Sequence, residues 1–564
     1  MTDSHLILAS YQKWGEGCVE RLIGDFVFAI WDARKQSLFC ARDPLGIKHF
    51  YYYHDRGRLF AFASEIKALF ALPEVPQRLN EAAVANHLLP THEDKTSTLY
   101  QSIARLPANH CMSISRESLK LRQCWAPNLK QELKLRSDNE YAEAFKDVFT
   151  EAVRCRLRSA FPVGSMLSGG LDSSSISCVA ENILAKEGKE PLHTFSAIWP
   201  SIAHINPKID ERKFMSSVVA TGDFNHHDVR VDRISPLIDS EKIIWHQDGP
   251  VSAPNMYMDW TIFKTAQQNG VRVLLGGTDG DTTVSYGYED LEAFVRRGWW
   301  IKFFREVAAL SRNMPRSRRN FRKLVWSSAF APLIPELAKQ SWRLLQGQPR
   351  EVDERDTLPA YCRNRPINSD FANRIKVKET FWALQNNSFP SDMTSREDHW
   401  RAISCGMWSY LLETYEKAGA SFSLDLRYPF FDRRVIEFCL ALPPGQRLNG
   451  GWTRSILRRA MSGILPTEVQ WRTSKGNLSP GLNLQLLEHE QEALDDVVVH
   501  SHKHIQKYVD AQAVGAVYRR YAANPLQCND EVFTLMLIIN LSSWLRHAGF
   551  TQASELGVKE LACV

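Results

Sequence analysis

A short loop of glycine, serine and aspartate at residues 168–174 constrains the fold of this chain more than any other feature. The residues before it, 163–167, form a short apolar segment typical of a buried strand. The residues after it place Ile176, Val179 and Ala180 on one face of a helix that we expect to begin at about Ser173. A strand, a glycine turn and a helix in this order predict an α/β domain.

The same loop has the composition of a pyrophosphate site. Gly169 and Gly170 let backbone N–H groups approach an anion, and the helix N-terminus adds partial positive charge. Ser173 and Ser174 add hydroxyl donors, whereas the carboxylate of Asp172 would repel phosphate unless a Mg2+ ion lay between them. The alternative is a plain strand–turn–helix corner, which the full Ser-Gly-Gly-Xaa-Asp-Ser-Ser pattern makes the weaker interpretation.

Strand-like and helix-like segments alternate on both sides of this loop. A capping-box pattern at residues 137–140 opens a preceding helix. Further strands are expected at residues 193–199, 228–232 and 271–275, and helices at 210–220 and 260–268. This alternation predicts a doubly wound parallel sheet with ligands at the carboxyl ends of its strands. The last strand runs into residues 276–283, a second loop rich in glycine and acid.

The N-terminal region follows a different pattern. Aromatic-rich segments at residues 26–32, 37–43, 49–53 and 59–63 are separated by turns, as is typical of consecutive antiparallel strands. A length of 564 residues exceeds what one hydrophobic core supports. We therefore expect two domains, an antiparallel-sheet domain over residues 1–130 and a parallel-sheet domain with a helical extension over residues 137–564.

Composition excludes several classes of protein. The apolar fraction of 44% and charged fraction of 24% are those of a globular enzyme, and a net charge of +5 is too small to indicate nucleic-acid binding. We read the basic run at 312–323 as a solvated face and the polar stretch at 346–370 as a linker. Trp299 and Trp300 are expected to anchor a helix in the core.

The cysteines and the apolar runs indicate where in the cell the protein is expected to be. Eleven scattered cysteines without a Cys-Xaa-Xaa-Cys pair argue against a disulfide framework or a zinc ribbon, and favour the cytoplasm. No signal peptide is read at the N-terminus. The longest apolar run, residues 532–545, is too short to span a membrane and predicts a buried helix.

Several motifs resemble the asparagine synthetase superfamily. Residues 168–174 resemble the PP-loop of N-type ATP pyrophosphatases, residues 276–282 lie where asparagine synthetases carry Ser-Gly-Glu-Gly-Ser-Asp-Glu, and residues 424–432 resemble Leu-Glu-Val-Arg-Val-Pro-Phe-Leu-Asp. The resemblance implies ATP and Mg2+ as cofactors, Asp172 and Asp281 as metal ligands, and Lys475 with Asp281 as catalytic residues. It implies an ATP site formed by Leu167, Ser168, Gly169, Gly170, Leu171, Asp172, Ser173, Ser174, Ser196, Ala197, Gly276, Gly277 and Thr278.

The N-terminal region resembles the later half of the superfamily's glutaminase domain of the Ntn type, at residues 22–32, 41–48 and 62–69. In that family an N-terminal cysteine is the nucleophile, whereas no cysteine precedes Cys18 here. Ile23 occupies the position of the glutamine-binding aspartate, and it cannot hold an α-ammonium group. We therefore expect a partial, inactive glutaminase-like domain that releases no glutamate from glutamine.

Three stretches look most like the cyclases of lasso-peptide biosynthesis: residues 276–285, 451–454 and 475–480. Thr278 replaces the family's glutamate, which suggests a nucleophile other than ammonia. This resemblance implies macrolactam closure of a precursor peptide, with a leader-binding protein or leader protease as partner. Asparagine synthetase is the alternative enzyme, and a catalytically dead binding or scaffold protein is the alternative of another class.

Overall fold

The computed structural model describes residues 2–313, 325–326, 329, 358–388, 394–500 and 505–550. Most of the expected basic run, and residues 346–357 of the expected linker, lie outside this part of the chain. Residues 358–370 do not form a linker, because they contain helix α16 (Ala360–Arg363) and the start of helix α17 (Ser369–Arg374).

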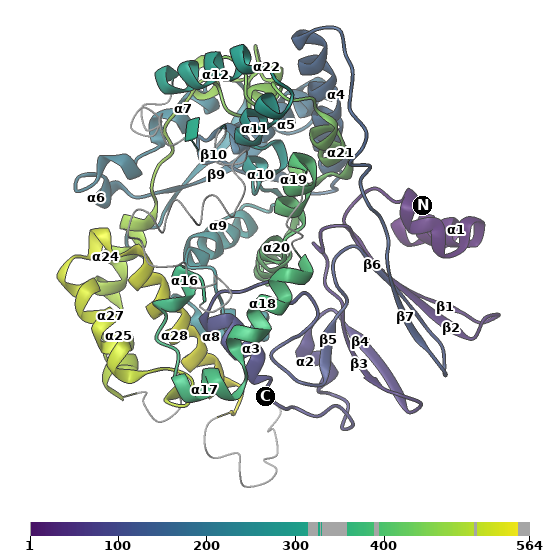
Figure 1. Ribbon diagram of the computed structural model, residues 1–564, viewed down its shortest axis with the longest axis vertical. Coiled ribbons are helices and arrows are strands. Elements are labelled where there is room, and N and C mark those ends of the chain that lie inside the picture. The colour runs from purple at the N-terminus through teal and green to yellow at the C-terminus, as the bar shows by residue number, and fades with distance from the viewer. Residues whose placement is uncertain are drawn as a thin grey trace.

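A five-stranded, fully parallel sheet organises the larger part of the molecule (Figure 1). This confirms the doubly wound α/β expectation. The strand order is β10-β9-β8-β11-β12, with β8 from the glycine-loop strand at the centre. The strands are β8 (Val163–Met166), β9 (Leu192–Ile198), β10 (Phe224–Arg230), β11 (Val273–Leu275) and β12 (Asp425–Arg427).

Helices cover both faces of this sheet, and strand alternation divides the core between them. Leu274 packs with residues of α9 (Met256–Gln268) and α20 (Gly406–Ala420), whereas its neighbours Val273 and Leu275 pack with α4 (Asp138–Arg156) and α5 (Leu171–Lys186). The capping box of α4 is half formed. Ser137 Oγ accepts from Glu140 N at 3.2 Å, but the Glu140 carboxylate accepts from Arg136 N instead of Ser137 N.

The long helix α28 (Asn529–His547) is buried along most of its length, as residues 532–545 predicted. It packs against α27 (Ala511–Ala523), α8 (Ser240–Gln247) and α3 (Glu81–Leu88). None of the helices in the described ranges combines the length and apolarity that crossing a membrane requires. Other helices include α2 (Ile66–Leu69), α6 (Pro200–Ala203), α7 (Arg212–Val219), α10 (Gly280–Val284), α11 (Tyr288–Arg296), α12 (Trp300–Asn313), α18 (Val377–Ser388), α19 (Ser395–Ser404), α21 (Arg433–Ala441), α22 (Ser455–Ala460), α23 (Thr467–Gln470), α24 (Ser479–His489) and α25 (Gln491–Asp495).

The N-terminal strands are antiparallel, but they form two sheets rather than one meander. One sheet has the order β1-β2-β6-β7 and the other β4-β3-β5, so the second and third expected strands are not paired. Strand β2 pairs with β1 on one side and with the later β6 on the other, and β3 pairs with β4 and with the later β5. The elements are α1 (Asp3–Trp14), β1 (Val27–Asp32), β2 (Ser37–Arg42), β3 (Tyr51–Asp55), β4 (Leu59–Ala63), β5 (Ile103–Arg105), β6 (His110–Ile114) and β7 (Leu119–Gln123).

One disulfide joins Cys111 of β6 to Cys124, which directly follows β7, with a Cα–Cα distance of 5.8 Å. This disulfide was not expected, because the scattered cysteines argued against a disulfide framework. Two cysteines on neighbouring antiparallel strands are brought together by the sheet register, which spacing along the chain does not reveal.

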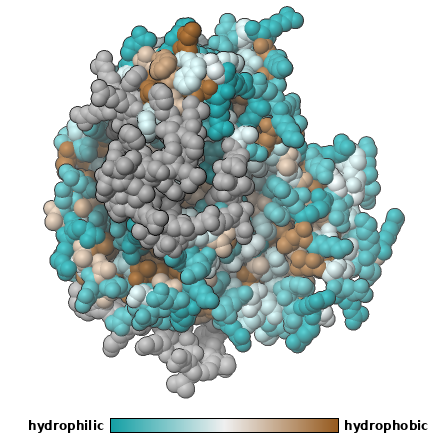
Figure 2. Space-filling view, in the orientation of Figure 1, coloured by the Kyte–Doolittle hydropathy of each residue, from teal (hydrophilic) through white to brown (hydrophobic). Residues whose placement is uncertain are grey.

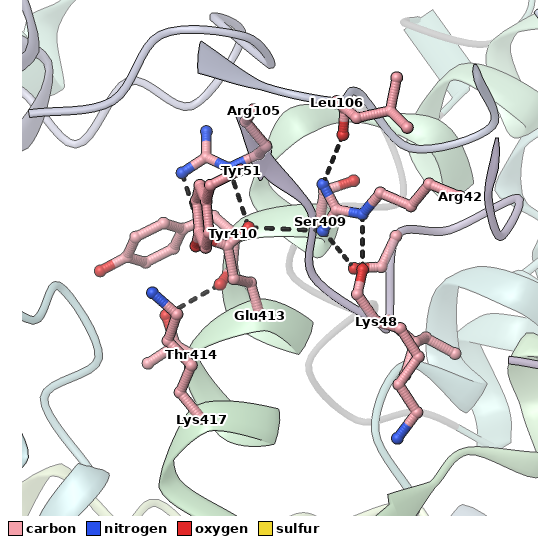
Figure 3. Close-up of polar contacts among 12 residues, drawn as sticks. Arg42, Lys48, Tyr51, Arg105, Leu106, Ser409, Tyr410, Glu413, Thr414 and Lys417 are labelled. Atoms are coloured by element: carbon pink, nitrogen blue, oxygen red, sulfur yellow. Dashed lines mark hydrogen bonds and ion pairs between the residues drawn. The ribbon is translucent and has the colours of Figure 1, made fainter. Parts of the chain in front are cut away.

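The two parts of the molecule are joined by a buried network of charges (Figure 3). Glu413 of α20 accepts hydrogen bonds from Arg105 and from the hydroxyl of Tyr51, and Arg42 Nη2 lies 3.4 Å from its Oε2. Lys417, one turn along α20, lies 4.6 Å from the Tyr51 ring centroid. Because Arg42, Tyr51, Glu413 and Lys417 are buried and Arg105 is only partly exposed, these groups depend on one another for charge neutralisation.

The face shown in Figure 2 is mostly hydrophilic, with apolar side chains at the end of the molecule where α12 lies and also on the side of the antiparallel sheets (Figures 1 and 2). Trp299 is 42% exposed and Trp300 is 38% exposed, so the expectation that they are core anchors is wrong. The buried stripe of α12 is formed instead by Phe303, Val307 and Leu310.

Candidate active site

A large cavity lies where β8, β9 and β11 end, as expected for a parallel sheet. It encloses about 1080 Å³ of empty space, including its open mouth. Three loops surround it: the glycine loop after β8, the second glycine loop after β11, and the irregular segment 471–478. The polar wall residues are Ser168, Asp172, Ser173, Glu211, Thr278, Asp281, Arg454, Arg472, Ser474 and Lys475.

The glycine loop presents the N-terminus of α5 to this cavity. The helix begins at Leu171, two residues earlier than expected, with Gly170 as its N-cap. Gly169 makes the turn with φ +68°, and the hydroxyls of Ser168 and Ser173 are hydrogen-bonded at 2.9 Å across it. The unsatisfied N–H groups of a helix of this length, next to two hydroxyls, form an anion site.

The second loop packs directly against the first. A Cβ on Gly277 would lie 2.9 Å from the backbone N and Cα of Ser173, and one on Gly280 would lie 2.6 Å from Cγ of Asp172. Glycine at these two positions therefore allows the loops to approach closely. This approach brings Asp281, in the first turn of α10, next to Asp172.

Arg454 lies between these two acids. Its Nη1 donates to both carboxylate oxygens of Asp172, at 2.9 and 2.7 Å, and to Oδ1 of Asp281. Lys475 Nζ lies 3.4 Å from the other oxygen of Asp281, although its side chain is 76% exposed. Two acids and two cations thus converge on one wall of the cavity.

Burial and charge act in opposite directions on the two acids. Burial raises the pKa of Asp172, and Arg454 offsets only part of that effect. Burial also disfavours the charged form of Asp281, but Arg454 and Lys475 outweigh it, so the pKa of Asp281 lies below its ordinary value. The pair therefore holds at least one carboxylate charge at neutral pH.

The segment carrying Lys475 is held over the cavity by Glu211. Its Oε1 accepts from Gly476 N at 2.6 Å and also from Arg472. Arg472 Nη1 in turn donates to the carbonyl of Gly169 at 3.0 Å. Glu211 and Arg472 therefore connect the glycine loop to the segment that positions Lys475.

Most of the residues predicted for the ATP site line this cavity. They are Leu167, Ser168, Gly170, Leu171, Asp172, Ser173, Ala197, Gly277 and Thr278. Four do not. Ser196 and Ser174 are fully buried, with Ser196 Oγ donating to the carbonyl of Leu167, and Gly169 makes the turn behind the wall. Gly276 lines a smaller cavity behind this one.

Sequence reasoning missed Arg454, Arg472 and Glu211. The motif ending in Arg454 was noticed, but it gave no sign that this side chain would reach two acids more than 170 residues away in sequence. Arg472 and Glu211 are single charged residues in unremarkable surroundings, and only the fold reveals that they meet. Among the described residues, no group of three or more histidine, cysteine or acidic side chains could hold a metal ion by itself.

The profile of the asparagine synthase family matches residues 144–546, which include every residue of this wall. The chain belongs to the asparagine synthase family. Its class is therefore that of ATP-dependent carbon–nitrogen ligases. A glutamine amidotransferase domain profile matches residues 1–125, the region of the two antiparallel sheets.

Curated relatives agree with this assignment at low identity. Asparagine synthetase [glutamine-hydrolyzing] 3 of Bacillus subtilis is 27% identical over 482 residues, which cover 84% of this chain and 70% of the relative. Putative asparagine synthetase [glutamine-hydrolyzing] 2 of Methanocaldococcus jannaschii is 31% identical over 286 residues, or 50% and 53% of the two chains. Amidase chyE of Penicillium rubens is 26% identical over 301 residues, or 52% and 44%.

The two N-terminal residues singled out from sequence lie apart from this cavity. Cys18 is fully buried in the 3₁₀ helix η1 (Gly15–Arg21), and burial raises the pKa of its thiol. Ile23 is 54% exposed. A buried thiol with a raised pKa is a poor nucleophile.

Proposed function

We propose that this chain uses ATP to adenylate a carboxylate and then joins that carbonyl to an amine, releasing AMP and pyrophosphate. In its most specific form, the carboxylate is an Asp or Glu side chain of a precursor peptide, and the amine is the N-terminus of the same peptide. The product is a macrolactam closed by an isopeptide bond. The observation that carries the proposal is the convergence of an anion-binding helix N-terminus, two acids and Lys475 on one cavity.

The donor set fits Mg2+. Asp172 and Asp281 bring carboxylate oxygens to a common point, now contacted by one nitrogen of Arg454, and Mg2+ prefers one or two carboxylates plus phosphate oxygens. These two residues would hold the ion, which when bound would neutralise charge on the pyrophosphate. The N-terminus of α5, with Ser168 and Ser173, would bind phosphate oxygens.

Lys475 is assigned to the carbonyl-transfer step. Its exposed ammonium reaches the cavity next to Asp281, where it can balance the negative charge that develops as the amine attacks and AMP leaves. Holding amine and activated carbonyl in one cavity supplies further acceleration through proximity.

Asparagine synthesis is the alternative function, and the names of the Bacillus and Methanocaldococcus relatives favour it. The chain's own residues favour an amine other than ammonia from glutamine. Thr278 lines the cavity, and it occupies the loop position at which asparagine synthetases carry glutamate. Cys18 is buried. Under the cyclase proposal, a leader-binding protein or leader protease would deliver the peptide.

The test presents the purified chain with Mg-ATP and synthetic peptides, each with a free N-terminus and one internal Asp or Glu at graded spacing. We expect AMP, pyrophosphate and a peptide lighter by one water. Parallel reactions contain L-aspartate with ammonium chloride or with glutamine. Asparagine without ring closure would select the alternative, and glutamate release would contradict the inactive N-terminal domain. ADP and phosphate would overturn the adenylation proposal, and an absence of any nucleotide cleavage would favour a binding protein.

A further inference from the structure

A second, smaller cavity lies directly behind the large one, on the side of β11 and β12. It encloses about 320 Å³ of empty space. Met166 and Thr278 line both cavities, so the two spaces adjoin across these side chains. Helix α9 forms a wall of each. Met258 faces the large cavity, and the next residue, Asp259, faces the small one.

Asp259 is the one charged side chain in the lining of this smaller cavity. It is 4% exposed, and within the described ranges its carboxylate receives neither a hydrogen bond nor an ion pair. Its other neighbours there are apolar residues, glycine, Thr278 and the hydroxyl-bearing Tyr415 and Tyr428. A buried, unpaired carboxylate is costly to the fold, so its presence beside the reaction cavity indicates a functional role.

We propose that Asp259 is the general base of the amide-forming step. This inference rests on the proposed function. The lone pair of the uncharged amine forms the new C–N bond with the adenylated carbonyl, and the N–H proton passes to the Asp259 carboxylate. The C–O bond to AMP then breaks, and its electron pair leaves with AMP. The proton on Asp259 is returned to solvent before the next turnover.

The surroundings of Asp259 suit this role. Burial raises its pKa to about 7, and no charged side chain contributes to the shift. A base with a pKa near the working pH is both ionised and strong enough to accept a proton. The titratable groups that face it in the smaller cavity are Tyr415 of α20 and Tyr428 after β12, and Tyr257 of its own helix α9 also interacts with it. Burial raises the pKa of all three phenols. They therefore stay uncharged and remain hydrogen-bond donors at neutral pH.

The position of Tyr428 is fixed by a close contact with the second loop. A Cβ on Gly276 would lie 2.9 Å from Cε1 of Tyr428, so glycine is required where the loop leaves β11. The same arrangement brings Thr278, two residues later, into the wall between the cavities. An amine entering the large cavity at Thr278 would approach Asp259 from the side of the nucleotide loops.

The test compares Asp259→Asn with Asp228→Asn, the same change at an exposed aspartate of β10 that lines neither cavity. The substrate is whichever probe the wild type accepts in the screen above, a synthetic peptide or L-aspartate with ammonium chloride. We expect Asp259→Asn to slow amide formation at least about 100-fold and Asp228→Asn to leave it unchanged. MgATP affinity should be the same in all three proteins.

Four further readouts separate a base from a residue that only supports the fold. The wild-type amide-forming rate should rise as the pH rises through about 7, and Asp259→Asn should lack that rise. Hydroxylamine, a strong uncharged nucleophile, should still trap the adenylate as a hydroxamate in the variant. In Asp259→Ala, added formate should restore part of the lost rate. The melting temperature of Asp259→Asn should equal or exceed that of the wild type above pH 7, because a buried charge is removed.

The outcomes distinguish this inference from the proposed function. Should the wild type make no amide from any probe, the proposed function fails and the base assignment falls with it. Should the wild type be active and Asp259→Asn match its rate, or lose MgATP binding instead, only the base assignment is wrong.

Discussion

Arg454 determines the electrostatic state of the cavity wall, since one of its nitrogens contacts both acids. The wall as a whole is balanced, with Asp172 and Asp281 facing Arg454 and Lys475. Asp172, Asp281 and Arg454 are only 12–25% exposed. They depend on this pairing, because removing one partner leaves a poorly solvated charge. We therefore expect the loss of Arg454 to reduce stability and the loss of the exposed Lys475 to reduce catalysis.

Replacing Arg454 with methionine should destabilise the fold and make it sensitive to magnesium. Loss of the shared cation leaves Asp172 and Asp281 without that partner, and we expect the free energy of unfolding to fall by about 3 kcal/mol. Saturating MgCl2 should raise the melting temperature of the variant more than that of the wild type, because the ion supplies the missing charge. Calorimetry measures both effects.

The matched control for this substitution is Arg296→Met. Arg296 pairs with Glu292 one helical turn away, and its side chain is 62% exposed, so its loss should cost about 0.5 kcal/mol with no magnesium dependence. Equal magnesium effects on the wild type and Arg454→Met would show that the two acids do not share a cation site.

Replacing Lys475 with alanine should impair catalysis while leaving the nucleotide bound. Loss of one preorganised electrostatic contact costs about 3 kcal/mol of transition-state stabilisation, or roughly a hundredfold in rate. Lys475→Arg should also be slow, because a planar guanidinium does not reproduce a compact ammonium. Product mass and MgATP affinity, measured together, separate the two effects.

Lys213→Ala is the control for Lys475→Ala. Lys213 is 77% exposed and lies 3.4 Å from Glu468, nearly the same exposure and ion-pair distance as Lys475 with Asp281, but it lies outside the cavity lining. If Lys475→Ala behaves like this control, Lys475 is an ordinary surface lysine. If it loses MgATP binding, it belongs to the phosphate site.

At the scale of elements, the site is made by three loops that the sheet brings together. The glycine loop and the second loop were recognisable from sequence because each follows an apolar strand and has an unusual composition. The segment 471–478 has no such strand before it, and its position depends on Glu211 at the start of α7. The contact with Glu211 is therefore expected to hold this segment in place.

Glu211→Ala should release the segment that carries Lys475. The carboxylate of Glu211 receives hydrogen bonds from Gly476 N and Arg472, and without it we expect trypsin to cleave after Arg472 or Lys475 at least about tenfold faster. Amide formation should fall as well, because Lys475 loses its fixed position. Mass spectrometry of the fragments gives the cleavage sites.

Glu468→Ala is the control, because Glu468 contacts Ser217 and Lys213 on the same helix α7 without reaching the segment. Unchanged cleavage in Glu211→Ala would mean that the segment is held by Arg472 and its contact with the carbonyl of Gly169 instead.

Periodic elements were predictable from sequence, and the failures have identifiable physical causes. Helix α28 and strands β8, β9 and β11 were found because apolar residues recur with the right period. Strand β12 was missed, because Asp-Leu-Arg has no apolar run, and its identity as a strand depends on pairing with β11. Strand β3 pairs with β5, about 50 residues later, and such non-local pairing leaves no local signal.

Within the site, the sequence indicated which loops meet but not which side chains face the cavity. Ser196 was expected in the ATP site, but alternation along β9 directs Phe195 and Ala197 to the cavity and Ser196 away from it. Arg454 and Asp259 were not assigned roles, because the groups around each are brought close by folding alone.

At the scale of the whole molecule, the two antiparallel sheets are joined to the synthase region by a shared apolar core and by a network of charged groups beside it. Arg42 at the end of β2, Tyr51 of β3 and Arg105 of β5 all reach Glu413 of α20. A second polar contact is more exposed: the uncharged indole Nε1 of Trp125 donates to Glu437 at 3.0 Å, and the Glu437 side chain is 41% exposed. The two acids provide a matched pair for testing what holds the molecule together.

Glu413→Gln should weaken this junction strongly. The positive groups around Glu413 hold its pKa well below the ordinary value against the effect of burial, so it stays ionised at neutral pH. Removing the charge leaves the buried Arg42 and Lys417, and the partly exposed Arg105, without that partner, which should lower the free energy of unfolding by about 3–5 kcal/mol at pH 7. Glu437→Gln should cost about 1 kcal/mol or less.

The difference in free energy of unfolding between the wild type and Glu413→Gln should decrease at acidic pH. A glutamate with a depressed pKa in the folded state contributes stability that is fully present above its unfolded pKa, about 4.3, and is lost as the pH falls towards the folded value. The gap between the wild type and Glu413→Gln should therefore be constant from about pH 8 to about pH 5 and narrow below about pH 4. Hydrogen exchange should show β3 and α20 losing protection together in Glu413→Gln at pH 7. If α20 stays protected while β3 opens, or if Glu437→Gln has the larger effect, the buried charge network is not what joins the two parts.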